Sequence, residues 1–263
     1  KVFGVNFKSN WIRNYQKPNI TKNSINLSTP NISIKNIFEL IDMDYFKGET
    51  TIEYAQEKLN YNYLKKKNEI IIKSSSGKST NFKINGNILL KPFYFDLALL
   101  IREKKIDYLI DNIIFNLINY DPKYLGNLSG IFKIKFEELN NKIIKSGEII
   151  FDVSERKLNL RSNYFSLGKI GDLNTKINFL EDKGEIVFVS QNVLNLKDHL
   201  EFAKVLQISP KKIKNIKTID FDIEKNLGSS DFTISNIKIN KKEDDKILEK
   251  NFYIKNIQNL KST

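Results

Sequence analysis

The residues that could take part in a reaction are few and lie far apart in the sequence. His199 is the only histidine, so a triad of serine, histidine and an acidic residue would have to include it. It falls in a segment whose spacing predicts a short helix, and a histidine on a helix surface is the simpler interpretation. The run from 74 to 80 contains Gly-Lys-Ser at 77–79, as phosphate-binding loops do, but Ile72 stands where the motif requires its first glycine. We therefore predict neither a hydrolytic triad nor a phosphate-binding loop.

Metal-binding and acid–base chemistry have no better support. The chain has no cysteine, which excludes a disulfide framework and a thiolate metal site. Asp42 and Asp44 have the spacing of a calcium loop but lack its glycine and its closing glutamate. Other carboxylates, such as that of Asp152, fall on solvent-facing or turn positions, and nothing in their spacing brings two together in a pocket. We predict that the protein is not an enzyme and uses no metal or cofactor.

The charge of the chain allows two interpretations. A net charge of +12 would suit a nucleic acid or an anionic membrane surface. The sequence is rich in Lys, Asn and Ile throughout, however, and acidic residues are interspersed, which favours a general compositional bias. Tyr61 and Tyr63 alternate with polar residues as in a half-buried strand, and Trp11 lies beside Ile12 as core or rim residues do. We expect no nucleic-acid partner.

The strongest signal in the sequence is an alternation of apolar and polar residues between 128 and 189. Phe132 and Ile134, for example, alternate with lysines, and similar short segments follow. A period of two is typical of strands with one apolar face and one wet face. Turn residues such as 146–147 and 168–171 separate the segments, and turns this short join antiparallel neighbours. These features predict an antiparallel β-meander.

The same alternation extends over most of the chain, from 2 to 37, from 48 to 99 and from 219 to 239. A change of parity between Ile234 and Ile237 predicts a β-bulge between them. The fold class that we predict is therefore mainly β.

Two segments have the three- and four-residue spacing of an amphipathic helix, at about 102–119 and about 197–206. Pro122 would end the first helix, and Pro210 lies beyond the second. Either helix could lie on a membrane surface, but we expect both to cover an open end or edge of the β-sheet. The apolar face of the sheet needs cover as well. It can close into a barrel, pack on a second sheet, or curve into a groove that holds a ligand.

A series of short segments, taken in chain order, carries a family resemblance. The segments are 86–97, the helix at 102–119, 128–134, 147–160, 165–171, 201–204, 213–223 and 234–237. In this order they resemble the AsmA-like C-terminal region of bacterial envelope proteins related to AsmA and TamB. The resemblance covers 81–263, and residues 1–80 fit as a further strand segment continuous with the groove.

The resemblance implies a periplasmic protein with a long curved β-groove, or open barrel-like sheet, lined by apolar side chains. It also implies attachment to the inner membrane and a role in moving phospholipid between the inner and outer membranes, or in outer-membrane assembly. The chain opens at Lys1 in a strand-like segment, with neither an initiator methionine nor a signal peptide. We therefore expect a piece of a longer protein, with the membrane anchor outside this chain.

Alternation and resemblance together predict a non-enzymatic segment that holds phospholipid acyl chains. The predicted groove lining is Phe82, Ile84, Phe132, Ile134, Phe136, Ile149, Phe151, Val153, Ile177, Phe179, Ile186 and Phe188. Each of these residues could equally pack in an ordinary sheet core. The first alternative is therefore a structural or interaction module of envelope biogenesis without bound lipid. A basic nucleic-acid-binding protein is the less favoured alternative, and it would gather its basic residues on one face.

Overall fold

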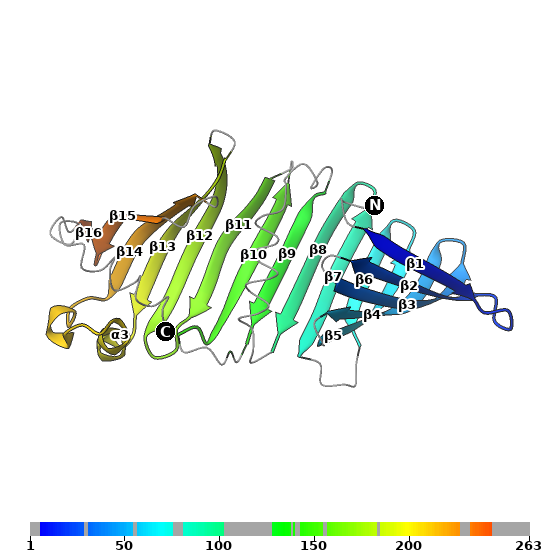
Figure 1. Cartoon of the computed structure of the whole chain (residues 1–263), viewed down its shortest axis with the longest axis horizontal. Helices are drawn as coiled ribbons and strands as arrows, with labels where there is room; N and C mark the ends of the chain where they lie inside the picture. Colours follow the sequence, from blue (N-terminus) through cyan, green and yellow to red (C-terminus); the bar gives the residue numbers. More distant parts are fainter. Residues whose placement is uncertain are drawn as a thin grey trace. The chain divides into compact units, whose positions relative to one another are not determined.

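The computed structural model describes residues 6–28, 31–54, 57–75, 81–102, 128–137, 139, 143–154, 157–182, 185–226 and 232–243. These residues confirm a mainly β fold, with 16 strands in one sheet whose spatial order follows the chain (Figure 1). The strands are β1 (Phe7–Arg13), β2 (Ile20–Ser28), β3 (Asn31–Asp42), β4 (Tyr45–Tyr54), β5 (Glu57–Lys66), β6 (Glu69–Ser74), β7 (Phe82–Leu90), β8 (Phe93–Ile101), β9 (Gly130–Phe136), β10 (Ser146–Ser154), β11 (Lys157–Ser166), β12 (Gly171–Asp182), β13 (Glu185–Leu196), β14 (Thr218–Asn226), β15 (Phe232–Ile239) and β16 (Lys242–Glu243).

One strand pair departs from the predicted antiparallel meander. β8 and β9 are parallel, with Leu97 opposite Phe132 and Leu99 opposite Ile134. Short turns cannot make a parallel connection, but the stretch from 102 to 129 is long enough for the crossover that a parallel pair requires. The prediction of a purely antiparallel sheet is therefore wrong at this pair, where the connection is longer than a turn.

The helix predicted at 197–206 is confirmed as α3 (His199–Leu206). It starts at Asp198, whose Oδ1 accepts hydrogen bonds from the N–H groups of Leu200 (2.8 Å) and Glu201 (3.2 Å). It ends at Gln207, which adopts a left-handed conformation with φ of 55°. A short 3-10 helix, η3 (Pro210–Lys212), follows. The helix predicted at 102–119 lies outside the described residues from 103 onward, so the described part contains one α-helix and not two.

The bulge predicted in the last part of the chain is confirmed in β15. Asp220 pairs with Lys238 but Asp222 pairs with Ser235, so β15 has one extra residue at this point. Asn236 takes the left-handed conformation there, with φ of 53°, and its Nδ2 donates to Oδ2 of Asp222 at 2.6 Å.

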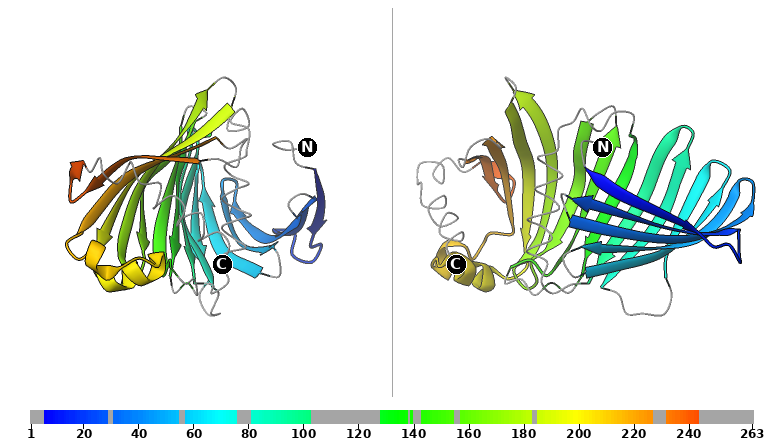
Figure 2. Two further views of the ribbon diagram at one scale, coloured as in Figure 1. Left: turned by 60° about the vertical axis from the view of Figure 1, so that its left-hand side comes forward. Right: turned by 45° about the vertical axis from the view of Figure 1, so that its right-hand side comes forward.

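The chain divides into two compact units, and each is described by itself. The first unit contains 1–138 and 151–157, and the second contains 139–150 and 158–263. The predicted division at residue 80 follows the extent of the family resemblance and stays a prediction. Within the first unit the strands rotate progressively, so that β1 and β8 run in clearly different directions (Figures 1 and 2). Such rotation is the normal twist of a sheet accumulated over several strands.

In the second unit, α3 lies at one end of the strands beside it (Figure 1). Its Phe202 and Ala203 are buried in a cluster with Ile170, Leu194 and Ile213. The helix therefore packs its apolar side against the end of the sheet, which is the role expected for it.

Candidate functional site

In the first unit, one face of the sheet carries all of the described buried side chains. Cross-strand partners share a face, and the pairing places Ile72, Phe82 and Ile134 on the same one. We call this the inner face of the first unit. Ile101 is fully buried on it, whereas polar and charged residues such as Lys83 dominate the opposite, outer face.

Seven of the predicted lining residues belong to the first unit. They are Phe82, Ile84, Phe132, Ile134, Phe136, Phe151 and Val153. The register places five of them, on β7 and β9, on its inner face, the ring contact with Phe132 places Phe151 there, and Val153 shares the face of Phe151 because it lies two residues further along the strand. The rings of Phe132 and Phe151 make contact, with 6.3 Å between their centroids. These residues differ in how deeply they are buried. Phe151 is only 2% exposed and Ile134 only 3%, whereas Ile84 and Phe132 are partly accessible.

The remaining lining residues belong to the second unit. Ile177 pairs with Ser190, and Phe179 pairs with Phe188 at 5.9 Å between ring centroids, so all four share one face. We call this the inner face of the second unit. Ile177, Phe179 and Phe188 are partly accessible, and Ile149 is buried. The backbone of the last predicted residue, Ile186, lies in β13 opposite Glu181, but its side chain lies outside the described part.

A row of neutral polar side chains crosses the inner face of the first unit, which the sequence reasoning missed. Asn23, Asn36, Thr50 and Tyr61 face one another in turn across β2 to β5. The Thr50 hydroxyl donates to Oδ1 of Asn36 at 3.1 Å. Burial raises the pKa of Tyr61 above its ordinary value, and a hydrogen bond with Thr50 acts in the opposite direction. The sequence does contain a sign of this row, because Asn and Thr occupy positions in the alternation where the neighbours on the same face are apolar.

A second polar row crosses the inner face of the second unit. Asn163 faces Thr175, and Thr175 faces Asn192, on β11, β12 and β13. All three are buried, as is Ser190 beside them. Oδ1 of Asn163 accepts from the N–H of Ile150 at 3.0 Å, and Nδ2 of Asn192 donates to Oγ of Ser190 at 2.9 Å. Within the described residues, the Thr175 hydroxyl has no hydrogen-bond partner.

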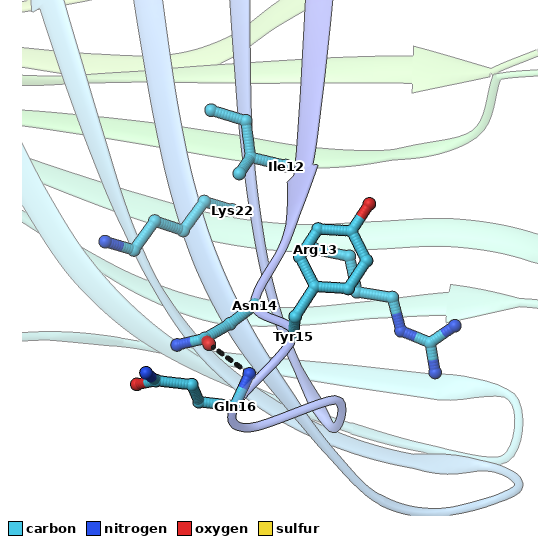
Figure 3. Close-up of a pocket in the computed structure, with 6 residues that line it drawn as sticks. All are labelled: Ile12, Arg13, Asn14, Tyr15, Gln16 and Lys22. Atoms are coloured by element: carbon cyan, nitrogen blue, oxygen red, sulfur yellow. Dashed lines mark hydrogen bonds between the residues drawn. The ribbon is translucent and has the colours of Figure 1, made fainter.

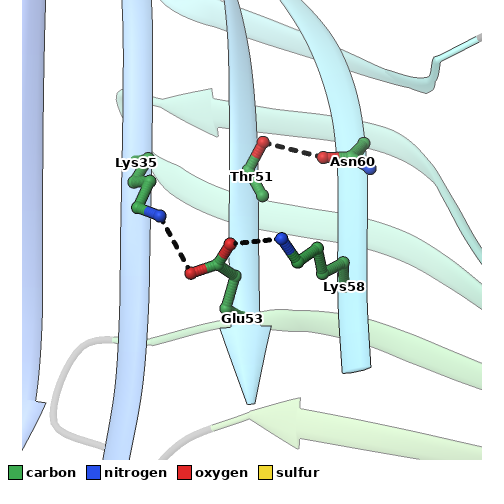
Figure 4. Close-up of polar contacts among 5 residues, drawn as sticks. All are labelled: Lys35, Thr51, Glu53, Lys58 and Asn60. Carbon is green, nitrogen blue, oxygen red and sulfur yellow. Dashed lines mark hydrogen bonds and ion pairs between the residues drawn. The ribbon is translucent and has the colours of Figure 1, made fainter. Parts of the chain in front are cut away.

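The outer face of the first unit carries paired charges of both signs. Glu53 accepts from Lys35 (3.0 Å) and from Lys58 (2.9 Å), and the Thr51 hydroxyl donates to Asn60 beside them at 2.7 Å (Figure 4). The hydrogen bonds from Lys58 and Lys35 hold the pKa of Glu53 below its usual value. These lysines therefore face a carboxylate of their own sheet.

The described residues offer little for other chemistry. They contain no group of three or more His, Asp or Glu side chains placed to hold a metal ion. His199 is the first residue of α3 and is partly exposed. The Gly-Lys-Ser tripeptide lies outside the described residues. None of the described helices is long and apolar enough to cross a membrane.

A hollow with a volume of about 430 Å³ lies at the turn between β1 and β2 (Figure 3). Oδ1 of Asn14 accepts from the N–H of Gln16 at 2.9 Å within it, and Tyr15 is 95% exposed. The hollow is lined by Ile12, Arg13, Asn14, Tyr15, Gln16 and Lys22. Because its lining is so accessible to solvent, we do not assign a ligand to it. The inner faces are the stronger candidate, since they combine accessible aromatic rings with buried polar rows.

Comparison with known proteins does not identify a family for this chain. The chain matches no protein-family model, and no significant match to it is found among curated proteins or solved structures.

Proposed function

We propose that this chain is a non-enzymatic, lipid-binding segment of a bacterial envelope protein of the AsmA type. Phospholipid acyl chains would lie along the inner faces of its sheet, which would act as a groove for transport between the inner and outer membranes, or for outer-membrane assembly. The protein would lie in the periplasm, held at the inner membrane by a segment outside this chain.

The observation that carries the proposal is a group of partly accessible apolar side chains on the inner face of the second unit, two of them aromatic rings in contact. In the second unit, Ile177, Phe179 and Phe188 share one face and remain partly exposed. Covering apolar surface stabilises by roughly 25 cal/mol per Å², so a hydrocarbon chain over these side chains would bind favourably. The contribution from the lipid is roughly 0.8 kcal/mol per buried methylene.

Transport along a groove also requires that no single position holds the lipid too tightly. Apolar side chains repeated along successive strands satisfy this requirement, because each neighbouring position offers the same kind of contact. Reaction chemistry is not needed for such a role.

The test is lipid analysis of protein purified without detergent, by mass spectrometry of the organic extract. The inner-face variant Phe179→Gln/Phe188→Gln changes two cross-strand partners. The matched control Leu180→Gln/Val187→Gln changes the partners next to them on the opposite face of the same two strands. Leu180 is 54% exposed, so its replacement should leave the fold intact.

We expect near-stoichiometric phospholipid in the wild type and in the control, and a large loss in the inner-face variant with an unchanged circular dichroism spectrum. A wild-type protein that carries no lipid, and takes none up from phospholipid vesicles, would refute the proposal.

A structural or interaction module is the second candidate, and the burial of Phe151 and Ile134 favours it, because filled positions of this kind belong to a protein core. That module would show cooperative unfolding with no bound lipid. A nucleic-acid-binding role has less support, because cations on the outer face of the first unit, such as Lys35 and Lys58, pair with a carboxylate.

A further inference from the structure

The inner face of the first unit carries a lysine beside an aromatic pair. The rings of Phe38 and Phe46 make an edge contact, with 6.0 Å between their centroids. Lys65 is the cross-strand partner of Phe46, and its Nζ lies 4.9 Å from the centre of that ring. The register continues from Lys65 to Ile70, which places all three side chains on the inner face. All three are partly accessible to solvent, so one ligand can reach both the rings and the charge.

The inner face of the second unit repeats this arrangement on other strands. Phe179 and Phe188 make an edge contact at 5.9 Å, and Lys225 on β14 is the cross-strand partner of Phe188. All three side chains are again partly accessible. Among the described side chains that β12, β13 and β14 place on this face, Lys225 is the only one with a charge. Each unit therefore combines two accessible rings with a lysine on its inner face.

Both lysines lie at the rim of the sheet. Lys65 is the penultimate residue of β5, and Lys225 is the penultimate residue of β14. From Lys225 toward the middle of the sheet, the side chains on the same face include Ile223 on β14 and Ile177 on β12. An elongated ligand can therefore keep a polar end at the rim, near solvent, while its hydrocarbon lies over the face.

Neither ammonium group has a hydrogen-bond acceptor within the described part of the chain. Lys225 has no ion pair there, and for Lys65 the carboxylate oxygen of Asp44 lies 3.9 Å from Nζ, which is longer than a hydrogen bond. On the outer face of the first unit, by contrast, Nζ of Lys47 lies 2.9 Å from the carboxylate of Glu39. An ammonium group has three N–H donors, so both inner-face lysines can donate to a ligand.

The combination of charge and accessible rings restricts the chemistry of that ligand. A compact positive charge attracts an anion, and a phosphate oxygen accepts a charge-assisted hydrogen bond from an ammonium group. The neighbouring rings offer no such contact, but they favour hydrocarbon. An amphiphile with a phosphate joined to an acyl chain meets both requirements, whereas free phosphate meets only one.

We propose that Lys65 and Lys225 each bind the headgroup phosphate of a lipid whose acyl chain lies over the neighbouring aromatic pair. This inference rests on the proposed lipid-binding function and adds a selectivity to it. The rings supply most of the affinity, and the lysine discriminates a phosphate-bearing lipid from an uncharged lipid with the same chain.

The test is a competition between two lipids that differ in the phosphate, 1-oleoyl lysophosphatidic acid and 1-monooleoylglycerol. Lipid-free protein is incubated with an equimolar mixture below the aggregation thresholds, free lipid is removed, and mass spectrometry of the organic extract gives the bound ratio. An ion pair at a partly exposed site should give the wild type a preference of about 3- to 10-fold for the phosphate. Inorganic phosphate at the same concentration should not change the ratio, because it has no chain to hold it on the rings.

The variant Lys65→Gln/Lys225→Gln should lose the preference and still bind 1-monooleoylglycerol. The matched control Lys83→Gln/Lys176→Gln removes the same charge from exposed positions on the outer faces of the two units, and it should keep the preference. Lys65→Arg/Lys225→Arg retains both charges and should keep it as well. The two single Gln variants test each unit separately, so a loss of fold in one unit leaves the result for the other unit interpretable.

Equal binding of the two lipids by the wild type would overturn this inference and leave the proposed function standing. An equal loss of preference in the outer-face control would also overturn it, because the selectivity would then come from the net charge of the chain. If inorganic phosphate abolishes the preference, the lysines bind the free ion and the assignment to a lipid headgroup is wrong. If the wild type retains neither lipid and carries no phospholipid, the proposed function fails as well.

Discussion

Phe151 separates the two interpretations of the inner face, because it is predicted to line a groove and yet is 2% exposed. If the protein itself buries the ring, Phe151→Ala removes a core side chain and leaves a cavity. Phenylalanine-to-alanine changes in cores cost about 3–5 kcal/mol of unfolding free energy. The contact with Phe132, at 6.3 Å between centroids, should contribute about 0.5–1.5 kcal/mol of that loss.

The assay is urea unfolding of lipid-free protein followed by far-ultraviolet circular dichroism. Phe132→Ala is the matched control, because Phe132 is the partly accessible member of the pair and should cost less. The double variant measures their coupling, which should match the ring-contact contribution. A loss below about 1 kcal/mol for Phe151→Ala would refute the reasoning, because no core phenylalanine is that dispensable.

Two further predictions follow from single contacts. Gly48→Ala should destabilise the first unit by about 1–3 kcal/mol, because its Cβ would lie 2.5 Å from the Tyr63 ring; thermal melts should show the loss shrinking in a Tyr63→Ala background. In the second unit, burial acts to raise the pKa of Asp172, but hydrogen bonds from Lys197 (2.6 Å) and Tyr164 (2.8 Å) outweigh it and lower that pKa. Asp172→Asn should therefore lower the melting temperature at neutral pH, and the difference from wild type should fade as the pH drops below about 4, where the wild-type carboxylate also loses its charge. A pH-independent difference would contradict the assigned cause.

The alternation of apolar and polar residues predicted most of the fold. It located the strands between 128 and 189, and the change of parity before Ile237 located the bulge in β15. Period-two patterning also determines which residues share a face, so the predicted lining residues on β7, β9, β12 and β13 lie on the inner face of their unit. The pattern could not predict how deeply each residue is buried, because alternation indicates the face of the sheet and not what covers that face.

Other features depend on partners distant in sequence. Ser146-Gly147 was predicted as a turn, but both residues lie in β10, and this prediction is wrong. Gly147 has a packing role there, because a Cβ would lie 2.7 Å from the ring of Phe165. Trp11 was expected to pack in a core or at a rim, and it lies at a rim, 61% exposed with its ring against Phe38. Neither contact can be inferred from neighbouring residues.

The polar rows show most clearly why a sequence pattern alone does not predict which side chains become neighbours in the sheet. Polar residues at apolar parity look like interruptions of a strand, and in β11 a register shift between Leu160 and Ser162 changes the parity, so that Asn163 shares a face with Leu160. Pairing across three strands turns such separate interruptions into one row. The Thr175 hydroxyl, for example, is buried without a hydrogen-bond partner among the described residues, and this is visible only in the assembled sheet. Which polar side chains lie side by side on a face therefore depends on register as much as on composition.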